Sequence, residues 1–130
     1  MATKTIYVSL QGQGNSTNLR LVDSEGHDGV NDITTNVDPN DIVIWEVNPN
    51  PPAGSQAIGS ITNVYKKTAP DPTNYSLLIA NPTLNAAGNF QGTVVPASQS
   101  PGSGKKESYS IDYTRTNGTT GSDDPKLNMN

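Results

Sequence analysis

The amino-acid sequence predicts an all-β protein, a Greek-key β-sandwich of about eight strands. Apolar and β-branched residues occur in short runs that alternate with polar residues, as in strands with one buried face. Segments rich in Asn, Gly, Ser and Pro, the residues that favour turns, separate these runs. No window of about 11 residues shows the apolar spacing of an amphipathic helix.

The first half of the chain contains three predicted strands. Residues 5–10 alternate cleanly and place their apolar side chains on one face, and residues 19–22 form a second, shorter run. Residues 41–47 are nearly continuous in apolar and β-branched side chains, which predicts a strand buried on both faces. Trp45 lies inside this run and is therefore expected in the core.

Five further runs complete the predicted set: residues 58–66, 76–79, 90–95, 108–113 and 126–129. In the run 108–113, the residues Tyr109, Ile111 and Tyr113 share one face, which predicts that they pack in the core.

Four polar segments connect the predicted strands. Residues 28–37 and 84–88 are each expected to hold a helical turn or two at most. Residues 48–56 and 96–107 have almost no apolar content and are expected to form long exposed loops. Neither loop separates two segments that could each bury a core, so residues 1–130 are predicted to form one domain.

The composition is polar but weakly charged. Asn, Ser, Thr, Gly and Pro supply 63 of the 130 residues, and charged residues 15%, against about 25% in an average domain. A net charge of −4, with only eight Lys and Arg, argues against a nucleic-acid partner. No apolar run reaches about 18 residues, so we expect no transmembrane helix and no membrane partner.

The sequence contains no cysteine, which excludes disulfides, thiolate metal sites and a cysteine nucleophile. The N-terminal segment lacks the charged and apolar regions of a signal peptide, which predicts a cytoplasmic protein. A secreted protein is the alternative if Met1 simply precedes a mature chain.

Two segments carry a resemblance to a known family. Residues 37–48 (VDPNDIVIWEVN) run from a turn into an apolar strand that ends near Trp and Asn, and residues 108–129 supply the last two strands. Both segments resemble cupredoxin-like domains, over about a quarter of the chain. This resemblance implies a β-sandwich, and an immunoglobulin-like sandwich is the alternative.

The resemblance does not extend to the copper ligands. A blue-copper site needs a Cys thiolate and two imidazoles, whereas this chain has no Cys and a single histidine, His27, far from the terminal loop. Met129 lies beyond the point where a ligand loop would close. We therefore expect a copper-free domain with no electron-transfer function and no resident cofactor.

The acidic segment at residues 23–32 is a candidate metal site. Asp23, Glu25, Asp28 and Asp32 supply carboxylate oxygens, which Ca²⁺ prefers as ligands. Their spacing departs from the EF-hand pattern. The favoured interpretation is a solvated loop containing His27, and a calcium site is the alternative.

Catalysis is not expected. His27 is the only imidazole base, and no Gly-x-Ser-x-Gly sequence presents a serine nucleophile. The three glutamates stand in no recognisable motif for glycoside hydrolysis.

The function is therefore predicted to reside in the surface. Sandwich edges expose unpaired backbone groups that charged side chains normally protect, yet residues 77–99 carry no charge. This pattern predicts a non-catalytic structural or interaction protein whose partner is a protein, namely itself, through edge strands. The alternative is a carbohydrate-binding module, with or without Ca²⁺, in which Tyr65 and Tyr75 are exposed and stack on sugar rings.

Overall fold

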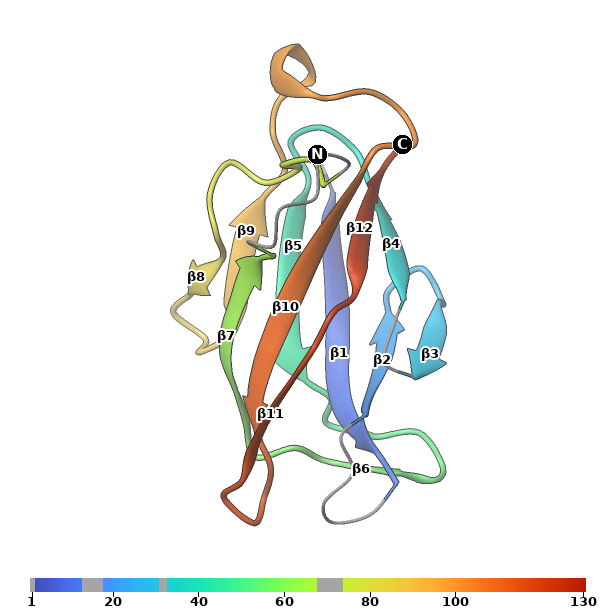
Figure 1. Ribbon diagram of the computed structural model, residues 1–130, viewed down its shortest axis with the longest axis vertical. Coiled ribbons are helices and arrows are strands. Elements are labelled where there is room, and N and C mark those ends of the chain that lie inside the picture. The colour runs from blue at the N-terminus through green and yellow to red at the C-terminus, as the bar shows by residue number, and fades with distance from the viewer. Residues whose placement is uncertain (1, 13–17, 31–32, 68–73) are drawn as a thin grey trace.

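The computed structural model describes residues 2–12, 18–30, 33–67 and 74–130, and two β-sheets packed face to face dominate it (Figure 1). The predicted all-β sandwich is thus confirmed. The described residues form twelve strands and one 3₁₀ turn: β1 (Thr3–Gln11), β2 (Leu19–Asp23), β3 (Asp28–Val30), β4 (Thr34–Val37), β5 (Ile42–Val47), β6 (Ser55–Gln56), β7 (Ser60–Lys66), β8 (Thr83–Leu84), β9 (Phe90–Thr93), η1 (Ala97–Gln99), β10 (Lys106–Thr114), β11 (Thr120–Asp123) and β12 (Lys126–Met129).

Both sheets are mixed. The seven-stranded sheet has the order β3-β2-β1-β5-β9-β8, with β6 also paired to β1, and its β1–β5 pair is parallel. In the five-stranded sheet, the long strand β10 pairs with β12 along its first part, with β11 along its last part and with β7. Strand β4 then runs parallel to β12.

The core lies between the sheets and follows the period of two that the sequence predicts. Trp45 of β5 and Tyr109 of β10 are both buried and come from opposite sheets. The Trp45 Nε1–H donates to Tyr109 Oη at 3.1 Å, and the rings meet edge to face with centroids 5.4 Å apart. Such a pair contributes about 0.5–1.5 kcal/mol beyond its buried area. The predicted core positions of Trp45, Tyr109, Ile111 and Tyr113 are confirmed.

The prediction that residues 41–47 are buried on both faces is wrong. Val43 and Trp45 point into the core, whereas Ile42 and Ile44 are only partly buried. Thr5 and Gln91, the partners of Ile44 in the neighbouring strands, are likewise only partly buried, so the described residues leave this part of the outer face partly open to solvent.

The helical turn that the sequence allows at residues 28–37 does not form in the described part of that segment, whereas residues 84–88 hold one hydrogen-bonded turn, with the Gly88 N–H donating to the Asn85 carbonyl at 3.0 Å. The described part of the first segment forms β3 and β4, and the second forms the turn of the β8–β9 hairpin, with Gly88 at φ 84°. Conversely, the predicted strand at residues 76–79 is reduced to a single bridge, Leu78 to Val94. In these polar segments, long-range backbone pairing decides the conformation rather than local pattern.

The two predicted loops contain short regular elements. Residues 48–56 end in β6, which pairs with the end of β1. Residues 96–107 contain η1 and the first two residues of β10. No helix in the described ranges is long and apolar enough to cross a membrane.

Candidate functional site

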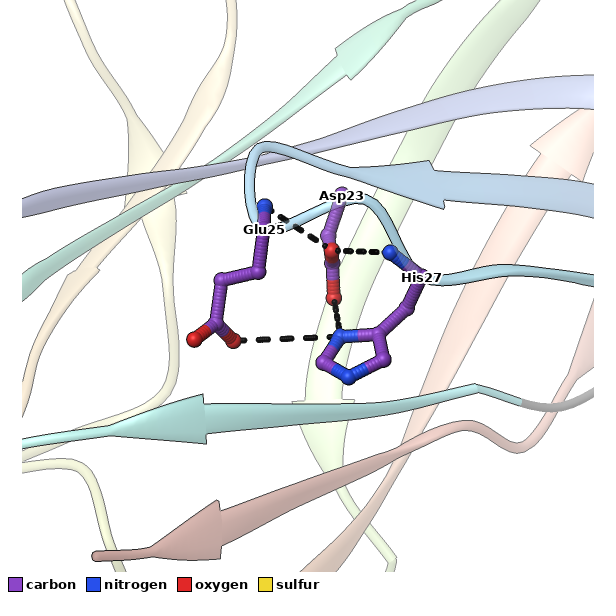
Figure 2. A group of neighbouring side chains, drawn as sticks. All are labelled: Asp23, Glu25 and His27. Carbon is purple, nitrogen blue, oxygen red and sulfur yellow. Dashed lines mark hydrogen bonds and ion pairs between the residues drawn. The ribbon is translucent and has the colours of Figure 1, made fainter.

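The acidic segment after β2 forms a tight turn between β2 and β3, centred on the buried carboxylate of Asp23. Asp23 Oδ1 accepts the backbone N–H groups of Glu25 at 3.0 Å and of His27 at 2.9 Å (Figure 2). Gly26 adopts φ 95°, a conformation that side chains with a Cβ rarely adopt. An aspartate whose side chain caps its own turn explains why this polar segment folds locally.

The second oxygen of Asp23 ties this turn to the opposite sheet. Asp23 Oδ2 accepts from His27 Nδ1 at 2.8 Å and from the Thr35 hydroxyl of β4 at 2.7 Å. Glu25 Oε1 accepts the Asn36 N–H of the same strand at 3.0 Å, and Glu25 Oε2 lies 3.5 Å from Lys4 Nζ. The turn therefore joins the two sheets at the edge strand β4.

The structure brings together only part of the predicted calcium set. Asp23 and Glu25 lie with His27, and one ligand atom from each falls within 4.8 Å of the others. Asp28 instead forms a two-pronged ion pair with Arg20, with Nη2 to Oδ2 at 2.8 Å. The predicted ligand Asp32 lies outside the described residues. A cation at this turn would compete with the four donors that already bind Asp23, and the calcium site stays a prediction.

The Asp23–His27 pair orients the imidazole. Because the Asp23 carboxylate can only accept, Nδ1 carries the proton, and Nε2 of the 42% exposed ring is left as the basic nitrogen. An acid–base dyad of this kind needs a nucleophile within hydrogen-bonding distance of Nε2. In the described part of the chain, no hydroxyl forms a hydrogen bond with this nitrogen.

Tyr65 and Tyr75, the predicted sugar-stacking pair, are both half-buried rather than exposed. Tyr65 pairs with Ser110 in β10, and its hydroxyl donates to Asp112 at 3.2 Å. Tyr75 donates its N–H to the Lys106 carbonyl, four residues along β10 from Ser110, so the two tyrosines lie about 13 Å apart along the strand. They do not form one continuous platform.

A buried carboxylate that our sequence reasoning missed lies on the inner face of β10. Glu107 is 2% exposed, and its Oε1 accepts the Leu77 N–H from the opposite side of the sandwich at 2.7 Å. Burial raises the pKa of Glu107, and the backbone N–H groups of Leu77 and Leu78, together with the charge of Lys66, offset part of that rise. Glu107 shares the alternation that places Tyr109 inside, which is the signal that could have identified it.

Glu107 thus holds the segment that forms one edge of the seven-stranded sheet. This edge consists of residues 77–81 and β8, which both lie along β9. Gly92 of β9 lacks a Cβ, so Leu78 and Pro82 pack directly over it; an added Cβ would lie 3.2 Å from Leu78 Cδ1. A shallow hollow of about 440 Å³ opens beside this contact, between residues 79–85 and 91–93.

Two large apolar side chains flank the hollow in exposed positions. Ile79 and Leu84 are each 62% exposed, and neutral Asn, Gln and Thr side chains make up most of the rest of the lining. The uncharged stretch that the sequence singles out, residues 77–99, therefore contains this whole edge.

Comparison with known proteins identifies no relative: no protein-family model matches the chain, and no curated protein matches its sequence. The fold defines the class as an all-β sandwich of two mixed sheets.

Proposed function

We propose that this chain is a non-catalytic interaction module that self-associates through the β8–β9 edge of its seven-stranded sheet. The observation that carries the proposal is the pair Ile79 and Leu84, each 62% exposed beside a hollow on an edge without charge. Burying both side chains against a second copy would remove their apolar surface from water, at about 25 cal/mol per Å².

Charge supports a second copy as the partner. Two chains of net charge −4 repel each other in general, but residues 77–99 contribute none of that charge. The backbone of β8, a strand of two residues, also provides unpaired groups at the sheet edge, which ordinarily call for charged protection. Two-fold pairing of the same edge would bury the same patch on both copies.

We also propose that the domain is a cupredoxin-like sandwich that lacks the copper ligands. The two segments that carry the resemblance form β5 in one sheet and β10 to β12 in the other. Met129 is 1% exposed in the core, and His27 lies in the β2–β3 turn, so neither supports a copper ligand set.

Light scattering coupled to size-exclusion chromatography tests the proposal over a wide range of protein concentration. We expect an oligomer that persists in EDTA and that Leu84→Lys and Ile79→Lys convert to monomer. Val30→Lys is the matched control, since Val30 is also an exposed apolar residue, 42% exposed, but belongs to β3 at the opposite edge. A wild-type protein that stays monomeric at the highest concentration would overturn the proposal, as would an oligomer that both lysine variants leave intact.

A further inference from the structure

Lysines that are far apart in the sequence meet at one end of the five-stranded sheet, the sheet that contains β10 and β12 in Figure 1. The chain has six lysines, and five of them belong to three segments that pair with the first part of β10 or form its start: Lys66, Lys67, Lys105, Lys106 and Lys126. Local sequence shows only two separate Lys-Lys pairs, and the strand register brings them together.

Strand register places three of these lysines on the outer face of the sheet. Ser108 lies between Lys67, whose N–H donates to the Ser108 carbonyl, and Lys126, its partner in β12. Lys106 lies two residues along β10, on the same face as Ser108. Neighbouring strands lie about 4.8 Å apart, so three amines share an area a few strands wide.

The neighbours of this lysine face are mostly neutral and polar. Lys105 is exposed beside it, with Nζ 5.3 Å from the centre of the Tyr75 ring. Asn128 Nδ2 donates to Asn36 Oδ1 at 3.0 Å on the next strands of the same face. Three carboxylates of the described residues lie nearby: Asp124 pairs with Lys67 at 2.9 Å, Asp112 lies further along β10, and Glu25 accepts the Asn36 N–H at 3.0 Å.

We propose that this lysine face binds a linear anionic polysaccharide, through carboxylate or sulfate groups along the sugar chain. Positive charge is concentrated here although the whole chain carries −4, so an anionic partner is drawn to this face rather than to the rest of the surface. Lysines supply the charge, and the amides of Asn36 and Asn128, together with Ser108, supply hydrogen bonds that suit sugar hydroxyls.

The surroundings favour a polysaccharide over other polyanions. Among the described residues, the exposed large apolar side chains are Val30, Ile79 and Leu84, which lie in or beside the other sheet, so the described surface offers a membrane no large exposed apolar side chain beside the lysines. Single-stranded nucleic acid binds on exposed aromatic platforms, whereas Tyr75 is half-buried with Lys105 over its ring.

Isothermal titration tests the proposal with heparin as the sulfated probe, polygalacturonate as the carboxylated probe and dextran as the neutral control. We expect binding to at least one anionic polysaccharide, no binding to dextran and weaker binding as salt rises. The double variant Lys105→Gln/Lys106→Gln is expected to weaken binding about 25-fold, since each lysine facing an anionic surface contributes about a factor of five.

A matched control separates the lysine face from overall charge. Lys4→Gln/Arg20→Gln also lowers the formal net charge from −4 to −6 but removes both positive charges from the seven-stranded sheet, and its affinity is expected to stay within about twofold of wild type. Equal losses in both double variants would overturn the proposal, as would no binding to either anionic polysaccharide at low salt. Tighter binding to single-stranded DNA, anionic vesicles or polyglutamate would also overturn it. Repeating the titrations with Leu84→Lys, the variant expected to be monomeric, separates polysaccharide binding from self-association, because this substitution lies outside the lysine face.

Discussion

The Asp23→Asn variant tests whether the β2–β3 turn fastens the two sheets together. The substitution keeps the volume of the side chain, but it replaces a carboxylate that accepts from four donors with an amide that has one acceptor oxygen and an NH₂ group. The amide oxygen can keep the two backbone N–H groups, while the NH₂ group takes the place of Oδ2, where the Thr35 hydroxyl and His27 Nδ1 must turn from donors into acceptors. All four hydrogen bonds then lose their charged partner. Since a hydrogen bond to a charged group contributes about 1.5–3 kcal/mol and a neutral one about 0.5–1.5 kcal/mol, the total loss is about 2–4 kcal/mol.

Urea unfolding measures this loss directly, because the single, fully buried Trp45 reports on the core by its fluorescence. A loss of this size lowers the melting temperature by roughly 10 °C in a domain of this length. Asp28→Asn makes the same chemical change in the same hairpin, at an exposed ion pair, and is expected to leave the unfolding midpoint near that of wild type. An Asp23→Asn variant within about 1 kcal/mol of wild type would refute the idea that this carboxylate holds the sheets together.

Two further predictions concern the pH dependence of stability at Glu107 and the effect of Ca²⁺ on the melting temperature. Burial raises the folded-state pKa of Glu107 above its ordinary value of 4.5. Glu107 therefore adds stability at pH values below 4.5, and this contribution is lost as the pH rises through the folded-state pKa. The free energy of unfolding of wild type relative to Glu107→Gln should therefore fall from pH 4 towards pH 7, and parallel curves would contradict the assignment. Since four donors already occupy Asp23, millimolar Ca²⁺ and EDTA should both leave the melting temperature unchanged; a rise of several degrees with Ca²⁺ would instead reveal a cation site.

Strands with strong alternation are predictable from the sequence because each one determines its own buried face. The period of two in β10 predicts that Tyr109, Ile111 and Tyr113 point inward, whatever strands lie beside them. The short polar strands β3, β4 and β8 could not be predicted in this way. They contain few apolar residues, and only their partners in distant parts of the chain make them strands.

The features of the candidate sites that could be predicted are likewise those that are continuous in the chain. Our reading of the sequence located the acidic turn and the uncharged stretch, because both are continuous in the chain. It did not predict that Asp23 contacts Thr35 of the opposite sheet, that Asp28 pairs with Arg20, or that Glu107 crosses the sandwich to Leu77. Each of these contacts joins residues whose proximity depends on how strands pair and how the sheets pack.

The sequence by itself determined the all-β class, the buried faces of the strands with strong alternation and the absence of thiol chemistry, because local periodicity and composition carry that information. Only the tertiary structure decided that an uncharged stretch becomes a sheet edge with Ile79 and Leu84 exposed, and that lysines from three segments share one face. The physical reason is that the choice of partner strands and the packing of the two sheets arise from contacts between residues far apart in the chain, which local periodicity does not specify.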